Sequence, residues 1–307
     1  MRIGFALPQI GKAAGPDAVV AVAKRAEELG YDSLWVLDRL LYPEKPRVPY
    51  VATADGSLPV QYKTVLDPLQ TLAFAAAQTK RIAVGTSVLN LPWYSPVLLA
   101  RSLATLDVLS GGRLSVGLGI GWSPDEYEAA GASWSNRGKR ADEFVRAIKT
   151  VWTTNPVEFK GEYVRIPKSF IGPKPIQKPH PPIYMAAYTP SSMQRVAREA
   201  NGWFPVGVPI KALGEMFNGI KGMAKEAGRN PAELALLVRG NVELSDSPAS
   251  GERADFTGTL DQIGRDIAAT KELGVTELIL DVQFSPGIES KEDYLRTMEQ
   301  LWKAAKK

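Results

Sequence analysis

The chain has 307 residues, 45% of them hydrophobic, and its net charge of +4 comes from 37 basic and 33 acidic residues. It contains no cysteine and one histidine, His180, which excludes disulfides, thiolate metal ligands and any site that needs two histidines. The basic residues are scattered, which argues against a nucleic-acid-binding surface, and no segment approaches the roughly 18 apolar residues of a membrane span.

Continuously apolar segments predict strands that are covered on both faces, as in a parallel sheet. Helical segments with a 3.6-residue period alternate with them, such as the one that ends at Gly30. This alternation favours a (β/α)8 barrel over a doubly wound sheet, and we expect residues 1–307 to form one domain. The eight predicted strands are residues 2–7, 33–38, 82–91, 113–121, 182–187, 202–206, 234–244 and 277–283.

Two long segments interrupt the alternation. Residues 39–64 carry Tyr42, Tyr50 and Tyr62 and follow the second predicted strand, whereas residues 158–181 start with a short hairpin pattern and continue into a proline-rich arm. Long loops in a compact domain usually act as lids or binding elements. We therefore expect the tyrosine-bearing segment to close over a substrate.

Three glycines alternate along the end of the fourth predicted strand. Gly117, Gly119 and Gly121 lie in the sequence GLGIGW, and glycine inside a strand marks a bulge or the close approach of a ligand or another backbone. The run does not fit the dinucleotide pattern GxGxxG, because Trp122 occupies the third glycine position. In a barrel the carboxyl ends of the strands form the active site, so we expect a cofactor here.

The sequence YTPSS after the fifth predicted strand is a candidate phosphate site. Thr189 can cap a helix whose first turn contains Pro190, and the free N–H groups and hydroxyls of Ser191 and Ser192 would face an anion. Ordinary helix capping explains the same pattern.

Several segments together resemble the bacterial luciferase-like flavin and deazaflavin oxidoreductases, and most of all their coenzyme F420-dependent branch. The resemblance rests on AKRAEELGYDSLWVLD, IAVGTSVLNLP, SPVLLARSLATLDVLSGGRLSVGLGIGW, IGPKPIQKPHPPIYMAA and ANGWFPVG, which occur in this order over nearly the whole chain. It implies a luciferase-like (β/α)8 TIM barrel with insertion loops.

The resemblance also implies where the cofactor lies. In this family the flat ring lies across the barrel mouth, and a cis peptide bond that does not involve proline supports its reactive face near the end of the third strand. Carried over to this sequence, the cis bond joins Ser87 and Val88. The cofactor-binding residues that it implies are Asp38, Ser87, Val88, Asn90, Ile120, Gly121, Asp125, Tyr188, Thr189, Ser191 and Ser192.

Asp38 and Arg39 are the candidate catalytic residues, and the proton donor is unidentified. The sugar-phosphate dehydrogenases of the family place a histidine after this acidic residue and a glutamate after the fourth strand. This chain has Arg39 and Trp122 at those places, which argues against a glucose-6-phosphate substrate. Arg39 is a solvated charge or an anchor for an anionic substrate, and Glu126 is interpreted as an ordinary helix-start residue.

The expected function is F420-dependent hydride transfer between the deazaflavin carbon C5 and an organic small molecule. Two alternatives remain: an FMNH2-dependent monooxygenase and a non-catalytic flavin-binding protein. The resemblance further implies a homodimer that uses the second and third helices. The sequence indicates no metal site, nucleic-acid partner or membrane partner, and its N-terminus has no signal-peptide pattern, so we expect a cytoplasmic location.

Overall fold

Parallel strands pair side by side in a closed cycle, which confirms the predicted barrel. The computed structural model describes residues 1–53, 55–249, 251 and 253–306. The hydrogen-bonded order is β3-β2-β1-β13-β10-β9-β8-β5-β4, and an additional pairing of β3 with β5 closes the barrel. The barrel strands are β1 (Arg2–Ala6), β2 (Ser33–Val36), β3 (Ala83–Thr86), β4 (Leu89–Asn90), β5 (Leu114–Gly119), β8 (Ile183–Met185), β9 (Gly202–Trp203), β10 (Ala235–Asn241) and β13 (Glu277–Asp281).

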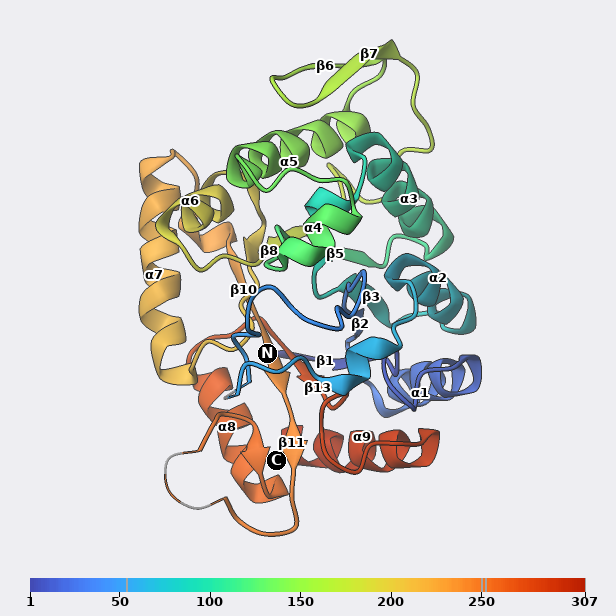
Figure 1. Ribbon diagram of the computed structural model, residues 1–307, viewed down its shortest axis with the longest axis vertical. Helices are drawn as coiled ribbons and strands as arrows, with labels where there is room; N and C mark the ends of the chain where they lie inside the picture. Colours follow the sequence, from blue (N-terminus) through green and yellow to red (C-terminus); the bar gives the residue numbers. More distant parts are fainter. Residues whose placement is uncertain (54, 250, 252, 307) are drawn as a thin grey trace.

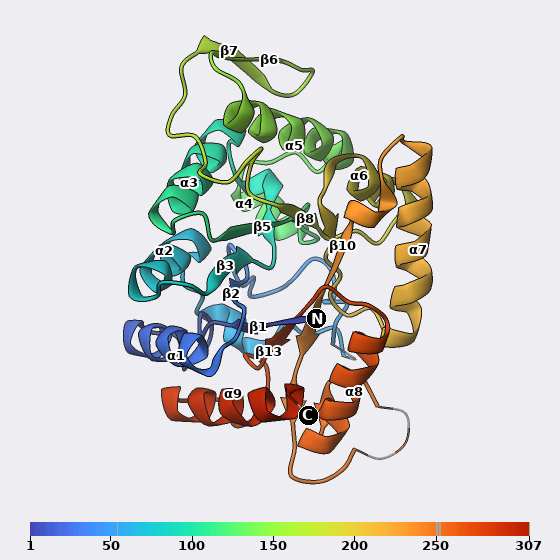
Figure 2. The same cartoon turned by 180° about the vertical axis from the view of Figure 1, so that it is seen from behind.

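Helices surround the strands as an outer ring, which Figures 1 and 2 show from the two sides. Short helix α4 and the light-blue segment that follows β2 instead cross in front of the barrel in Figure 1. The helices are α1 (Pro16–Leu29), α2 (Pro68–Gln78), α3 (Pro96–Leu109), α4 (Pro124–Ala129), α5 (Arg137–Thr153), α6 (Pro190–Glu199), α7 (Ile210–Glu226), α8 (Leu260–Glu272) and α9 (Lys291–Ala305), with short 3-10 helices at Val60–Lys63, Leu91–Trp93 and Pro231–Glu233.

The third predicted strand, residues 82–91, is two short strands rather than one. β3 ends at Thr86, the peptide bond between Ser87 and Val88 is cis, and the chain resumes as β4. The glycine at position 117 is required by its contact with Thr86. The Thr86 hydroxyl forms hydrogen bonds with the backbone of Gly117, and a Cβ on Gly117 would lie only 1.9 Å from the Thr86 carbonyl oxygen. Gly117 therefore serves the approach of another backbone and not of a ligand.

Large side chains fill the barrel interior. Trp35 and Phe204 meet edge to face with ring centroids 5.1 Å apart, and Tyr184, Leu237 and Ile279 pack around them. A Cβ on Gly85 would lie 2.5 Å from the Trp35 ring. This glycine therefore makes room for the tryptophan, and the barrel is a packed core closed below its mouth.

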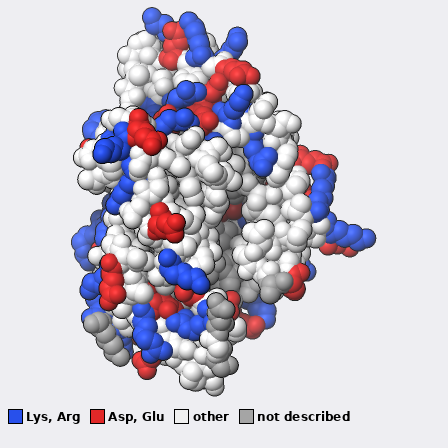
Figure 3. Space-filling model, turned by 90° about the vertical axis from the view of Figure 1, so that its left-hand side faces the viewer, with Lys and Arg blue, Asp and Glu red and all other residues white. Residues whose placement is uncertain are grey.

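The predicted hairpin lies outside the helical ring, next to α5 and α3 (Figure 1). It consists of β6 (Val157–Lys160) paired antiparallel with β7 (Arg165–Ser169), and a further short pair joins β11 (Glu243–Leu244) to β12 (Thr257–Gly258). On the face in Figure 3, residues of both charge signs are interspersed. Among the residues that the structure describes, no helix is both long enough and apolar enough to cross a membrane.

Candidate functional site

Asp38 lies just beyond the end of β2, and residues of β4 and the segment after it donate hydrogen bonds to its side chain. Its Oδ2 accepts hydrogen bonds from the backbone N–H of Asn90 at 2.9 Å and from the Tyr94 hydroxyl at 3.1 Å. The Asn90 side chain in turn donates to the Asp38 carbonyl oxygen at 3.2 Å. The structure thus brings together two predicted cofactor residues and adds Tyr94, which the sequence had not singled out.

Burial changes the chemistry of the Asp38 carboxyl. Removal from water raises its pKa from 3.8 to about 7, and the hydrogen bonds from Asn90 and Tyr94 only partly oppose this rise. Coulomb repulsion from Glu126 contributes in the same direction. A carboxyl group with a pKa near neutrality can hold or release a proton at physiological pH, which supports Asp38 as a candidate catalytic residue.

Val88 and the glycines at the end of β5 form a wall beside Asn90. A Cβ on Gly119 would lie 2.7 Å from Val88 Cγ2, and a Cβ on Gly121 would lie 3.5 Å from the Asn90 side-chain oxygen. Gly121 also has a φ of 70°, a left-handed conformation that favours glycine. The wall is therefore smooth because side chains are absent from its tightest points.

Arg239 is a buried arginine next to this wall, and it was not among the predicted site residues. Arg239 on β10 forms an ion pair with Asp281 on β13, and its Nη1 donates to the Ser87 carbonyl oxygen at 3.1 Å. The space bounded by these groups and Trp35 has no room for a water molecule. The sequence did contain a signal, since a charged residue interrupts the apolar strand LLVRGN.

Arg39 is buried, which excludes its interpretation as a solvated charge. Its side chain is 5% exposed, and Nη1 lies 3.2 Å from Glu126 Oε2, itself 1% exposed. The guanidinium lies over the rings of Tyr62 and Trp122, 5.0 and 4.9 Å from their centroids. Glu126 also accepts a hydrogen bond from the Leu40 N–H at 2.8 Å, so it is not an ordinary helix-start residue.

The aromatic cluster above Arg39 comes largely from the tyrosine-bearing segment. Tyr50 packs on Trp122 with ring centroids 5.2 Å apart, and its hydroxyl lies 3.3 Å from that of Tyr62. Tyr62 in turn meets Phe284 edge to face at 5.4 Å. We call residues 39–53 and 55–64 the lid segment, because Figure 1 shows this part of the chain crossing the barrel mouth.

Arg47 fastens the lid segment to α4. Its backbone N–H donates to Asp125 Oδ2 at 3.1 Å, its Nε lies 3.2 Å from Asp125 Oδ1, and it also forms an ion pair with Glu128. Asp125, a predicted cofactor contact, has its carboxylate engaged by the lid segment. Ile120, another predicted contact, is partly buried at the end of β5 and packs against the core.

Ordinary capping uses most of the polar groups in the predicted phosphate site. The Ser192 N–H donates to Thr189 Oγ1 at 3.3 Å, and the Ser192 hydroxyl accepts from the backbone N–H groups of Tyr188 and Thr189. Ser191 is exposed, with its hydroxyl 3.3 Å from that of Thr189, whereas Ser192 is buried. Any anion at this helix start therefore meets Ser191 and not the buried Ser192.

Helix α6 is tied to the first turns of α5, the helix that begins with Arg137. Arg195 on α6 donates to the Gly138 carbonyl oxygen at 2.8 Å and pairs with Asp142, so the first turn of α5 is tied to α6. Arg137 begins α5 and stacks on Trp134, 4.1 Å from the ring centroid. Its position could not be inferred from the sequence, because it depends on the packing of two helices.

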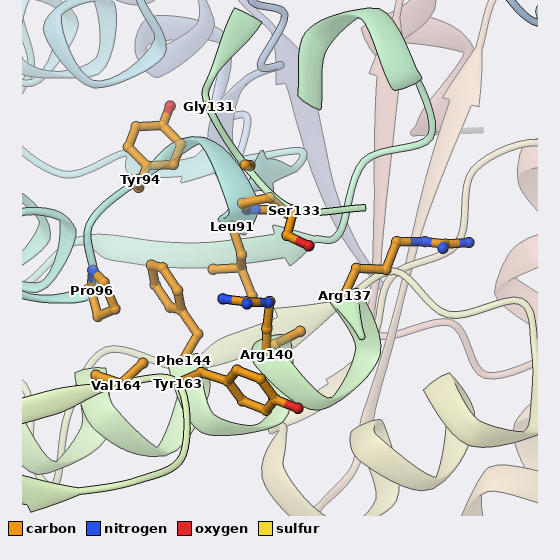
Figure 4. Close-up of a pocket in the computed structure, with 13 residues that line it drawn as sticks. Leu91, Tyr94, Pro96, Gly131, Ser133, Arg137, Arg140, Phe144, Tyr163 and Val164 are labelled. Carbon is orange, nitrogen blue, oxygen red and sulfur yellow. The ribbon is translucent and has the colours of Figure 1, made fainter. Parts of the chain in front are cut away.

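A cavity of about 200 Å³ lies between α5, the end of β4 and the β6–β7 hairpin. In Figure 4 the Arg140 guanidinium lies between Leu91 and Tyr163, whereas the Arg137 guanidinium points away from them. Tyr94 also lines this cavity and contacts Asp38 through its hydroxyl. The predicted cofactor residues themselves do not line the cavity.

The predicted site residues thus fall into separate groups. Asp38, Ser87, Val88, Asn90 and Gly121 meet at the barrel mouth, Asp125 lies on α4 with the lid segment, and the residues from Tyr188 to Ser192 lie at the start of α6. Within the described part of the chain, no group of three His, Asp or Glu residues is placed to bind a metal ion.

Comparison with known proteins identifies the family. Residues 1–254 match the family described as luciferase-like monooxygenase. The chain belongs to this family. An uncharacterised protein from Mycobacterium tuberculosis is 36% identical over 205 residues, which are 64% of this chain and 72% of that protein.

Two characterised relatives of this luciferase-like protein use different cofactors. The FMNH2-dependent dimethylsulfone monooxygenase of Pseudomonas putida is 32% identical over 155 residues, 50% of this chain and 42% of that enzyme. The F420-dependent glucose-6-phosphate dehydrogenase of Amycolatopsis mediterranei is 33% identical over 193 residues, 62% of this chain and 53% of that enzyme. The family is therefore settled, and it includes users of both cofactors.

Solved structures show the same fold over the whole chain. The monooxygenase RslO1 of Streptomyces bottropensis superposes with a TM-score of 0.81 at 25% identity, covering 99% of this chain and 98% of RslO1. The F420-dependent tetrahydromethanopterin reductase of Methanopyrus kandleri gives a TM-score of 0.76 at 18% identity, covering 99% of this chain and 97% of the reductase. Both confirm the luciferase-like barrel.

Proposed function

We propose that this luciferase-like protein is an F420-dependent oxidoreductase that transfers a hydride between the cofactor and an organic small molecule. The observation that carries the proposal is the meeting of Asp38, Val88, Asn90 and Gly121 at the carboxyl ends of neighbouring barrel strands. Active sites of this fold lie at that end. When bound, reduced F420 supplies the hydride from carbon C5 of its deazaflavin ring.

The residues at the barrel mouth fit a flat ring system. Val88 offers an apolar side chain, and Gly121 leaves the neighbouring edge without one. Ser87 Oγ is buried next to Val88 and has no hydrogen-bond partner among the described residues. The lid segment and its aromatic cluster would exclude water from the reacting atoms.

Under this proposal Asp38 holds or moves the proton that accompanies hydride transfer. The pKa of its carboxyl is about 7, and the carboxyl lies beside Asn90, at the edge of the proposed ring position. The cofactor phosphate would lie at the start of α6, where the Ser191 N–H and hydroxyl favour an anion.

The choice of F420 is supported by the longer match with the F420-dependent relative, 62% of this chain against 50% for the FMNH2-dependent one. The second candidate is an FMNH2-dependent monooxygenase on the same site. The likeness to the monooxygenase RslO1, with a TM-score of 0.81 over 99% of the chain, favours it.

A direct comparison of cofactor affinity tests the proposal. The purified chain would be titrated with F420 and with FMN while the quenching of cofactor fluorescence is followed. We expect F420 to bind at least about tenfold more tightly than FMN, which corresponds to about 1.4 kcal/mol. Tighter binding of FMN would support the second candidate, and failure of both cofactors to bind would refute both proposals.

We also propose a homodimer formed through α2 and α3, the helices that the resemblance indicated. Phe74 on α2 is 43% exposed, and Leu98 and Leu109 on α3 are 61% and 70% exposed. Exposed large apolar side chains on neighbouring helices are typical of protein interfaces. A second copy of the chain would remove them from water.

A further inference from the structure

The guanidinium of Arg39 is buried with only part of its hydrogen-bonding capacity used. Nη1 faces Glu126 Oε2 at 3.2 Å, but Nε and Nη2 have neither solvent exposure nor a hydrogen-bond partner among the described residues. Leaving buried donors unpaired is unfavourable, and more so for charged groups. An acceptor from outside the chain would remove this cost.

The geometry of Arg39 restricts where such an acceptor can lie. Nε and Nη2 share one edge of the planar guanidinium, so their N–H groups point the same way. The rings of Tyr62 and Trp122 lie against the guanidinium, and Glu126 faces its Nη1 end. The unpaired edge is therefore the direction left for a ligand, and it can bind one oxygen through two hydrogen bonds.

The surrounding charges select the kind of oxygen. The Glu126 carboxylate already balances the charge of Arg39, and the Asp38 carboxyl next in the chain interacts unfavourably with Glu126. A carboxylate ligand would add another negative group to the same buried region. A carbonyl oxygen has two lone pairs and no net charge, so it satisfies both donors without this repulsion.

The aromatic cluster indicates the shape of the ligand. Tyr62 and Trp122 lie against Arg39, and Tyr50 and Phe284 pack on these two rings with paired centroids 5.2–6.1 Å apart. Aromatic walls favour flat ligands that make offset or edge-to-face contacts. We infer that Arg39 is a substrate-binding residue, and that the substrate is an uncharged, planar carbonyl compound whose oxygen accepts from Nε and Nη2.

This inference rests on the proposed function, because a carbonyl compound is the kind of molecule that hydride transfer reduces. N–H donors on the carbonyl oxygen also stabilise the negative charge that grows there during reduction. Since Nε and Nη2 have no exposure in this conformation, the substrate enters when the lid segment moves away from the cluster.

Binding of simple aromatic probes to the intact chain tests the inference. Acetophenone, benzoate and ethylbenzene have similar size and offer a carbonyl, a carboxylate and no acceptor. Their dissociation constants would be measured by ligand-observed NMR. We expect acetophenone to bind about tenfold more tightly than ethylbenzene, and benzoate to bind more weakly than acetophenone.

Two variants connect the preference to Arg39. The double variant Arg39→Met/Glu126→Gln removes both charges, and Arg39→Lys keeps a charge but lacks the two-donor edge. Thermal unfolding would check that each folds, and both should lose the preference for acetophenone. Arg296→Met, a change of an exposed arginine on α9 and outside the lid segment, is the matched control and should retain the preference.

The outcomes separate this inference from the proposed function. Equal binding of acetophenone and ethylbenzene, tighter binding of benzoate, or an unchanged preference in both Arg39 variants would each overturn the inference. F420 and FMN affinities would be measured on the same samples. Absence of cofactor binding to the wild type would refute the proposed function and leave the probe comparison intact.

Discussion

Arg239 and Ser87 are joined across the barrel, because Arg239 Nη1 donates to the Ser87 carbonyl oxygen at 3.1 Å. The same guanidinium forms an ion pair with Asp281, whose side chain is 1% exposed. A residue on β10 thereby fixes the orientation of the backbone between β3 and β4, next to Val88. The wall of the proposed cofactor site is thus held from the opposite side of the barrel.

Replacement of Arg239 by methionine should damage both stability and cofactor binding. The buried Asp281 carboxylate loses its partner, which costs about 3–5 kcal/mol of the free energy of unfolding. The Ser87 carbonyl loses its donor as well, so F420 and FMN should bind more weakly. Chemical denaturation and cofactor titration measure the two effects.

The double variant Arg239→Met/Asp281→Asn is the control for this prediction. It removes both charges, so it should recover much of the stability while cofactor binding stays weak. Full recovery of cofactor affinity in the double variant would show that the bond to Ser87 does not position the site.

The raised pKa of Asp38 predicts how the free energy of unfolding depends on pH. Its pKa is raised from 3.8 to about 7 in the folded protein, so the folded state binds this proton more tightly than the unfolded state. The stability that Asp38 contributes is therefore fully present below about pH 4 and is lost as the pH rises through about 7. Asp38→Asn does not titrate and still accepts a hydrogen bond.

The difference in free energy of unfolding, Asp38→Asn minus wild type, should therefore increase between about pH 4 and about pH 8, by about 1–3 kcal/mol. Denaturant unfolding of both proteins across this range measures it. Asp293, whose pKa is lowered to about 2, titrates alike in both proteins and cancels. A difference that stays constant with pH would show that the Asp38 carboxyl is not perturbed.

The two serines after Pro190 should behave differently. Ser191→Asp places a negative charge at the exposed start of α6, where it repels a phosphate but favours the helix dipole. Cofactor affinity should fall by about tenfold or more without loss of stability. Ser192→Ala removes a capping hydroxyl and should cost about 1 kcal/mol of stability with little change in affinity. The reverse pattern would place the phosphate elsewhere.

The barrel itself was predictable because its signals are local. Apolar strands, periodic helices and stops such as Gly30 each depend on a few consecutive residues, and the structure confirms them. The interruption at Ser87 followed only from the family resemblance, because its segment reads as a continuous strand. The partners of Arg239 and Glu126, and hence their roles, could not be inferred in this way.

Those roles depend on residues that are distant along the chain. Arg239 Nη1 and Ser87 O are 152 positions apart, and the Leu40 N–H and Glu126 Oε1 are 86 apart. A sequence pattern shows that a charged residue occurs in an apolar strand or at a helix start, but it does not identify the partner. The phosphate site shows the opposite case, in which the local capping interpretation of Ser192 was right.

Arg47 should control how easily the lid segment opens. It is 54% exposed, so Arg47→Gln should change the free energy of unfolding by less than about 1 kcal/mol. Loss of its contacts with Asp125 and Glu128 should nevertheless speed hydrogen exchange in residues 39–53. Arg296→Gln, which breaks an exposed pair with Asp293 on α9, should not. Equal exchange in both variants would show that Arg47 does not restrain the lid segment.

The proposed dimer can be tested on the surface of α3. Leu98→Glu and Leu109→Glu each place a charge where the interface would exclude water, and both side chains are already more than half exposed in the single chain. The fold of one subunit should therefore remain stable while association weakens.

Leu273→Glu, a change of a leucine that is 41% exposed just after α8, is the matched control. Light scattering after size exclusion should give a dimer for the wild type and Leu273→Glu and a monomer for the double variant Leu98→Glu/Leu109→Glu. A double variant that stays dimeric would place the interface on another surface, and a monomeric wild type would refute the dimer.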